Sequence, residues 1–127
     1  MLIATAVLSG LMLMWPSIQN KRAGQMVEPI AAVQMMNHQD ALIVDIRAPG
    51  SFDKGRIPQS RNIPVKDFET RLEKEPKDKP IIVVCDRGQL AVGAAAKLRE
   101  SGFTQVSVLK GGLSAWVGAD LPTTTKR

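Results

Sequence analysis

The chain has 127 residues, of which 44% are hydrophobic and 23% are charged, as expected for one globular domain with a hydrophobic core. Its net charge of +5 does not indicate nucleic-acid binding, because the cationic residues are spread from Lys21 to Arg127 and aromatic residues for base stacking are few. The only cysteine, Cys85, cannot form an internal disulfide, and a free reactive thiol survives best in a reducing compartment such as the cytosol.

Residues 1–18 contain no charged side chain and are apolar on every helical face. As a helix they would reach roughly 27 Å, slightly short of the ~30 Å hydrocarbon layer of a membrane. A signal peptide would have a basic residue before the run and a small-x-small cleavage site after it, and neither is present. The pattern therefore predicts a transmembrane or membrane-anchor helix. The alternative is an extra amphiphilic or buried helix of a soluble domain.

Lys21 and Arg22 follow this segment, and the positive-inside tendency predicts that the domain after them faces the cytoplasm. Residues 19–27 are polar enough for a linker, residues 28–122 are expected to form the domain, and residues 123–127 a flexible tail.

The domain is expected to begin with a helix of about ten residues from Glu28-Pro29, because proline is tolerated in the first turn. Ile30, Val33 and Met36 would share its buried face, and the polar residues 37–40 would end it.

Strands are expected in four short segments. The apolar runs 41–45 and 81–84 match strands covered on both faces, and residues 105–109 alternate between apolar and polar. Residues 61–65 would supply a fourth strand, closed by Pro64.

Helical patterns lie between these strands. Residues 67–75 place Phe68 and Leu72 on one face, whereas Leu90, Ala94 and Leu98 predict a longer helix that ends at Gly102. The alternation predicts an α/β fold with an open, mainly parallel sheet of four to five strands flanked by helices.

Cys85 lies directly after the apolar run 81–84 and directly before a turn that contains Gly88. Reactive groups of α/β proteins gather at the carboxyl ends of strands. The unpartnered N–H groups at the start of the next helix would favour a thiolate or a bound anion. Cys85 is therefore the candidate nucleophile, although a lone cysteine after an apolar strand is also typical of a small buried hydrophobic residue.

Several separated segments, from about Glu28 to Pro122, resemble the single-domain rhodanese family of sulfurtransferases. They are Val44-Asp45-Ile46-Arg47 with Phe52, Gly55, Ile57, Asn62, Ile63 and Pro64, then residues 85–91 as the active-site loop, then Gly111-Gly112-Leu113-Ser114-Ala115-Trp116. The paired glycines would permit a tight turn and the indole would fill the core. With the apolar leader, the chain is similar to bacterial rhodanese-like proteins anchored in the inner membrane by a single pass.

The resemblance implies that Cys85 carries sulfane sulfur as a persulfide, without a metal or other cofactor. The donor would be thiosulfate or a persulfide, and the acceptor a thiol, cyanide or a protein. The backbone N–H groups of residues 86–90 would stabilise the charged sulfur and bind the donor, so the expected substrate-binding residues are Asp86, Arg87, Gly88, Gln89 and Leu90. Asp45 and Arg47 would support the loop.

Cysteine phosphatases, by contrast, need an arginine at the sixth position after the cysteine to clamp phosphate, and that position is Ala91. The loop therefore argues against phosphatase activity.

Three residues depart from the rhodanese pattern. Asp86 places a carboxylate beside the nucleophile, Leu90 stands where a polar or basic residue is common, and Arg56 replaces the histidine of Gly-His-Ile. The only histidine, His38, is expected to be exposed at a helix end. These departures motivate an alternative, a membrane-tethered interaction module that keeps the rhodanese fold, has little turnover and docks an inner-membrane protein.

Overall fold

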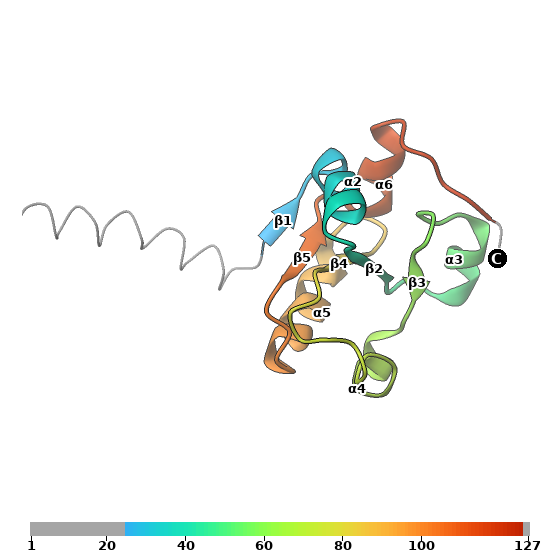
Figure 1. Cartoon of the computed structure of the whole chain (residues 1–127). Coiled ribbons are helices and arrows are strands. Elements are labelled where there is room, and N and C mark those ends of the chain that lie inside the picture. Colours follow the sequence, from blue (N-terminus) through green and yellow to red (C-terminus); the bar gives the residue numbers. More distant parts are fainter. Residues whose placement is uncertain (1–24, 126–127) are drawn as a thin grey trace, which may run out of the picture.

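The computed structural model describes residues 25–125, which form one five-stranded sheet covered by helices (Figure 1). The strand order is β1-β5-β4-β2-β3, and every neighbouring pair is parallel. The strands are β1 (Gln25–Val27), β2 (Leu42–Asp45), β3 (Arg61–Asn62), β4 (Ile81–Val84) and β5 (Val106–Leu109). The predicted open parallel α/β sheet is confirmed.

The helices are α2 (Pro29–His38), α3 (Pro49–Lys54), α4 (Phe68–Arg71), α5 (Gln89–Glu100) and α6 (Gly112–Gly118), with the 3-10 turn η1 (Val65–Asp67). None of these helices is long and apolar enough to cross a bilayer. The apolar leader at residues 1–18 and the first part of the expected linker lie outside the described residues.

Side chains of β4 alternate between the two faces of the sheet, as the strand period requires. Ile81 and Val83 belong to the core layer beneath α4 and α5, whereas Ile82 and Val84 belong to the layer beneath α2 and α6. Cys85 continues the first series and joins the layer of α5.

The buried face of α2 differs from the prediction. Pro29 and Ala32 are buried and Val33 and Met36 pack partly against the core, but Ile30 is 56% exposed. The inward stripe follows positions 29, 32, 33 and 36, so the assignment of Ile30 to this face was wrong by one residue. The helical periodicity alone does not show whether the buried face of α2 begins at Pro29 or at Ile30.

Two segments expected to be irregular carry backbone pairing. Residues 25–27 of the expected linker form β1, which pairs with β5 from Gln25–Ser107 to Val27–Leu109. In the expected flexible tail, Thr124 pairs with Arg56 through two backbone hydrogen bonds of 3.0 and 2.8 Å. Both pairings join segments far apart in the sequence, so local composition could not indicate them.

The helix predicted at residues 67–75 is shorter, because η1 and α4 together end at Arg71 and a turn follows. Phe68 and Leu72 are nevertheless buried in the core as expected. The helix after Cys85 is confirmed as α5, with Ala94 and Leu98 buried but Leu90 on the surface.

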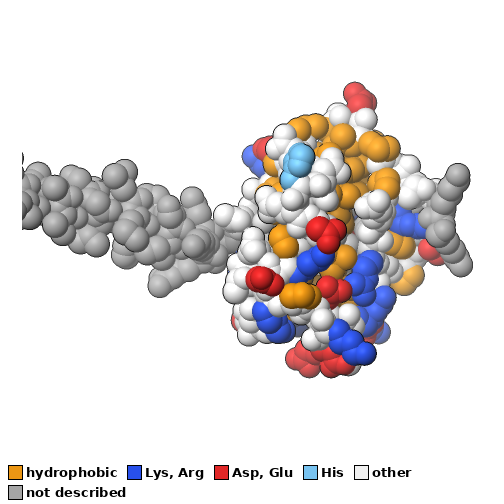
Figure 2. Space-filling view, viewed as in Figure 1, with side chains coloured by type: hydrophobic (Ala, Val, Ile, Leu, Met, Phe, Trp, Pro, Cys, Tyr) orange, Lys and Arg blue, Asp and Glu red, His pale blue; other side chains and the backbone are white. Residues whose placement is uncertain are grey.

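Among residues 25–125, the large hydrophobic residues that remain exposed are Met26, Ile30, Leu90, Val92 and Val117. Figure 2 shows hydrophobic side chains on the surface of the part that contains α2 and α6, with the pale blue histidine among them. That histidine, His38, is the exposed last residue of α2, as expected.

Candidate active site

Cys85 lies at the carboxyl end of β4 and lines a pocket of about 420 Å³. The cysteine is 4% exposed, so its sulfur is recessed, but it opens into this pocket and is not sealed in the core. The pocket is lined by Ile46, Arg47, Ala48, Ser51, Cys85, Asp86, Arg87, Gln89 and Leu90. Six of the eight site residues predicted from the sequence therefore line one pocket, and Asp45 and Gly88 lie directly behind it.

A larger cavity, about 570 Å³, lies beside Arg99 and Phe103 at the amino end of β5. The described residues that line it include no cysteine, histidine or carboxylate. The chemistry of the lining therefore favours the smaller pocket as the candidate active site. Within residues 25–125, no three histidine, cysteine or carboxylate side chains are grouped as a metal site would require.

The turn after Cys85 brings a backbone donor to the sulfur. The N–H of Gly88 donates a hydrogen bond to Cys85 Sγ at 2.9 Å, and α5 begins at the next residue. Gly88 has φ of +91°, and a Cβ there would lie 3.2 Å from Gly111 N. Glycine is required because its backbone adopts this conformation without strain and leaves room for the neighbouring loop.

The start of α6 holds the same loop from the other side. The N–H of Leu113 donates to Cys85 O at 2.9 Å, and the N–H of Ser114 donates to Asp86 O at 3.0 Å. A Cβ on Gly112 would overlap Cys85 O and lie 2.6 Å from Asp86 C. The second glycine of the pair therefore permits close packing of two backbones, a role the sequence analysis had limited to a tight turn.

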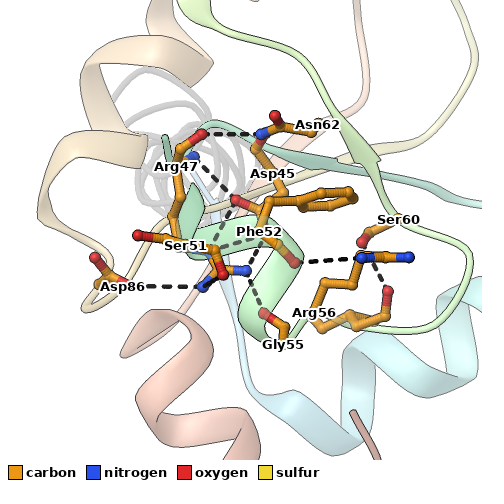
Figure 3. Close-up of polar contacts among 10 residues, drawn as sticks. Asp45, Arg47, Ser51, Phe52, Gly55, Arg56, Ser60, Asn62 and Asp86 are labelled. Carbon is orange, nitrogen blue, oxygen red and sulfur yellow. Dashed lines mark hydrogen bonds and ion pairs between the residues drawn. The ribbon is translucent and has the colours of Figure 1, made fainter. Parts of the chain in front are cut away.

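Asp45 and Arg47 form a buried ion pair beside the pocket (Figure 3). Arg47 Nε lies 3.0 Å from both carboxylate oxygens of Asp45, and Nη2 lies 2.7 Å from Oδ2. The backbone N–H of Arg47 donates to the same carboxylate. The Asn62 amide donates to the carbonyl oxygens of both residues, which fixes β3 to the end of β2.

Arg47 extends from this pair to α3, which the sequence analysis did not predict. Its guanidinium donates to Ser51 O at 3.3 Å and to Gly55 O at 2.7 Å (Figure 3). The expected support of the loop after Cys85 is limited to Asp86, whose Oδ1 lies 3.8 Å from Arg47 Nη1. Arg47 therefore mainly holds α3 at the pocket wall. The only sequence signal for α3 was Pro49, a common first residue of a helix.

The remaining predicted residues form the outer part of the pocket. Asp86, Arg87, Gln89 and Leu90 are all exposed. The exposed fraction is 71% for the Asp86 side chain and 78% for Leu90. The mouth of the pocket thus combines a carboxylate, a guanidinium and an apolar side chain.

Arg56, which replaces the family's histidine, is buried away from the lining of the pocket. Its guanidinium lies 4.6 Å from the centroid of the Phe52 ring and donates to Phe52 O at 3.3 Å (Figure 3). The residue therefore stabilises the end of α3.

Comparison with known proteins agrees with this architecture. Residues 28–119 match the rhodanese-like domain family. The chain is 40% identical over 95 residues to the uncharacterized protein YibN of Escherichia coli K12, covering 72% of this chain and 66% of YibN, slightly less than two thirds. It is 36% identical over 87 residues to the thiosulfate sulfurtransferase GlpE of Pseudoalteromonas translucida, covering 68% of this chain and 83% of GlpE.

A solved structure shares the fold. The rhodanese-like domain of the Anabaena protein Alr3790 aligns with a TM-score of 0.72 and 26% identity, covering 80% of this chain and 79% of that one. The family match spans strands β2 to β5, the loop after Cys85 and α6, and so includes every residue that lines the pocket. The chain therefore belongs to the rhodanese-like domain family.

Proposed function

We propose that this protein is a sulfurtransferase that carries sulfane sulfur on Cys85 as a persulfide. The observation that carries the proposal is the 2.9 Å hydrogen bond from Gly88 N–H to the Sγ of Cys85, a residue that lines the pocket. A backbone donor aimed at the sulfur stabilises negative charge there, and the thiolate is the form of cysteine that attacks. The likeness to proteins named sulfurtransferases supports the same reaction class.

The reaction proceeds in two displacements on sulfur. The Cys85 thiolate attacks the outer sulfur of thiosulfate or of a persulfide, the donor S–S bond breaks, and the electron pair leaves on sulfite or on a thiolate. An acceptor thiolate or cyanide then attacks the terminal sulfur of the persulfide, and the Cys85 thiolate leaves. Because Cys85 is nucleophile in the first step and leaving group in the second, Gly88 N–H supports both steps.

Mass spectrometry of the intact protein tests this proposal. Incubation with thiosulfate or an organic persulfide is expected to add about 32 Da, one sulfur atom, to the parent chain. Cyanide or a reductant should remove the addition, and Cys85→Ser should never acquire it. Because the chain has one cysteine, the modified position needs no further assignment. A parent thiol that stays unmodified under every donor would contradict the proposal.

A second candidate function is a binding module with little turnover. Leu90 supports it, because a side chain 78% exposed at the mouth of the pocket offers an apolar contact to another protein. This reading expects Cys85→Ser to bind its partner as well as the parent does, while the parent shows no measurable sulfur transfer. Loss of partner binding in Cys85→Ser would favour the enzyme.

We also propose that the apolar segment 1–18 anchors the domain to the inner membrane, with the domain in the cytoplasm. The charge-free run and Lys21-Arg22 after it support this orientation. The full chain is expected in the membrane pellet, and a Leu8→Arg/Leu11→Arg double variant in the supernatant. A membrane-impermeant maleimide should label Cys85 only after the cells are lysed. A parent chain found in the supernatant without detergent would contradict the anchor.

A further inference from the structure

Arg47, the cation at the base of the pocket, has few hydrogen-bond donors free to bind an anionic substrate. The Arg47 side chain is 5% exposed, and its guanidinium is bound to the Asp45 carboxylate and to the carbonyl oxygens of Ser51 and Gly55. Its remaining side, at Nη1, faces Asp86 Oδ1 at 3.8 Å (Figure 3). Asp86 thus places a carboxylate where the anionic group of a donor would otherwise meet this arginine.

The carboxylate of Asp86 is also close to the nucleophile in the chain, since it is the next residue after Cys85 and lines the same pocket. A donor that brings two negative charges is repelled by Asp86 as well as by the thiolate. The other cation of the lining, Arg87, is exposed, and so is Asp86, so water weakens the effect of both charges on an anion. Asp86 differs from Arg87 because its carboxylate lies 3.8 Å from the buried guanidinium of Arg47, at the base of the pocket.

The rest of the wall favours an apolar group. Ile46, Ala48 and Leu90 line the pocket, and Leu90 projects from the first turn of α5 with most of its surface in water. An aryl or alkyl group beside the sulfane sulfur could cover this side chain and remove apolar surface from water.

We propose that Asp86 makes this pocket selective for sulfur donors of low negative charge that carry an apolar group, such as organic thiosulfonates and organic persulfides, over the dianion thiosulfate. The proposal rests on the sulfurtransferase function proposed above and names its donor class. For a thiosulfonate, the Cys85 thiolate attacks the terminal sulfur, the S–S bond breaks, and the electron pair leaves on a sulfinate. Each reactant and each product carries one negative charge, whereas thiosulfate enters and sulfite leaves with two.

The test compares benzenethiosulfonate, a monoanion, with thiosulfate, using kcat/KM for thiocyanate formation from cyanide. Because the two donors differ in intrinsic reactivity, the change of their ratio on mutation decides the question. Asp86→Asn, of nearly the same shape, is expected to raise kcat/KM for thiosulfate about fivefold or more, and to shift the ratio of the two donors toward thiosulfate at least about threefold. The shift should shrink as KCl is raised, because salt screens exposed charges.

Leu90→Ala should shift the ratio in the same direction by lowering kcat/KM for benzenethiosulfonate. The matched control is Asp78→Asn, which changes net charge equally at an exposed site before the amino end of β4, remote from the end that carries Cys85. It should leave both rates unchanged.

Equal effects of Asp86→Asn on both donors, or a fall for thiosulfate, would overturn the selectivity while leaving sulfur transfer intact. If Cys85 takes sulfur from neither donor in the parent, the sulfurtransferase function fails and this proposal fails with it.

Discussion

Gly112 packs its Cα against the backbone of Cys85 so closely that a Cβ at this position would overlap Cys85 O and lie 2.7 Å from Arg87 N. Its φ of +61° is also in the left-handed region, where a non-glycine residue is strained. The first turn of α6 therefore acts as a template for the loop that follows Cys85, because the two segments pack this closely only when residue 112 has no Cβ.

Gly112→Ala is expected to reduce the free energy of unfolding by about 2–3 kcal/mol, from backbone strain and overlap, and to slow sulfur transfer to Cys85 at least about tenfold. Urea unfolding and the rate of persulfide formation measure the two effects. Gly93→Ala in α5 is the control, because a Cβ there meets nothing within 4 Å and should stabilise the helix by about 0.5–1 kcal/mol. Parent-like stability and activity of Gly112→Ala would refute the template.

Gly88→Ala is expected to slow alkylation of Cys85 by iodoacetamide several-fold, because the strained turn would move the N–H away from Sγ. Gly88→Asn should recover only a small part of the rate, since asparagine tolerates positive φ better than alanine does but places its Cβ equally close to Gly111 N. The only cysteine of the chain makes the label specific. Equal rates for the parent and both variants would show that this hydrogen bond does not activate the thiol.

Asp45→Asn is expected to cost about 3–5 kcal/mol of unfolding free energy, because it leaves the buried guanidinium of Arg47 without its counter-charge. The control is Asp40→Asn, which breaks the pair of Asp40 with Lys79, 2.9 Å apart, at a side chain that is almost fully exposed. Exposed pairs contribute no more than about 1 kcal/mol. Similar losses in the two variants would contradict the buried pair as a main support of the pocket wall.

Trp116→Phe should destabilise the fold by about 2 kcal/mol, since it removes the hydrogen bond from Nε1 to Pro122 O at 2.8 Å and leaves a void in the core layer beneath α6. Val117→Ala, the exposed neighbour on the same helix, should change stability by less than about 0.5 kcal/mol. Thermal unfolding of the two variants separates these outcomes. An unchanged midpoint for Trp116→Phe would show that the indole does not secure the carboxyl-terminal segment.

Local pattern was enough for the elements that bury apolar side chains at a regular period. The bounds of β2, β4 and α5 were predicted within one or two residues. The periods of strands and helices can be recognised from residues that are close in the sequence. The same reasoning placed Cys85 at the carboxyl end of a central strand. It failed for Ile30, and it missed the strand β1, whose partner β5 is distant in the chain. It also missed the short helix α3, which hydrogen bonds from the buried side chain of Arg47 hold in place.

The sequence by itself determined the central strands of the sheet, the position of Cys85 at the end of one of them and the glycine turn after it, because these depend on neighbouring residues and on local backbone freedom. Only the tertiary structure decided what faces the sulfur and the pocket mouth. The guanidinium of Arg47 binds the Asp45 carboxylate and the carbonyl oxygens of Ser51 and Gly55, and its Nη1 also faces the carboxylate of Asp86. These contacts form because the end of β2, the helix α3 and the loop after β4 come together in space. The local sequence pattern of each segment does not indicate which of these groups the guanidinium binds.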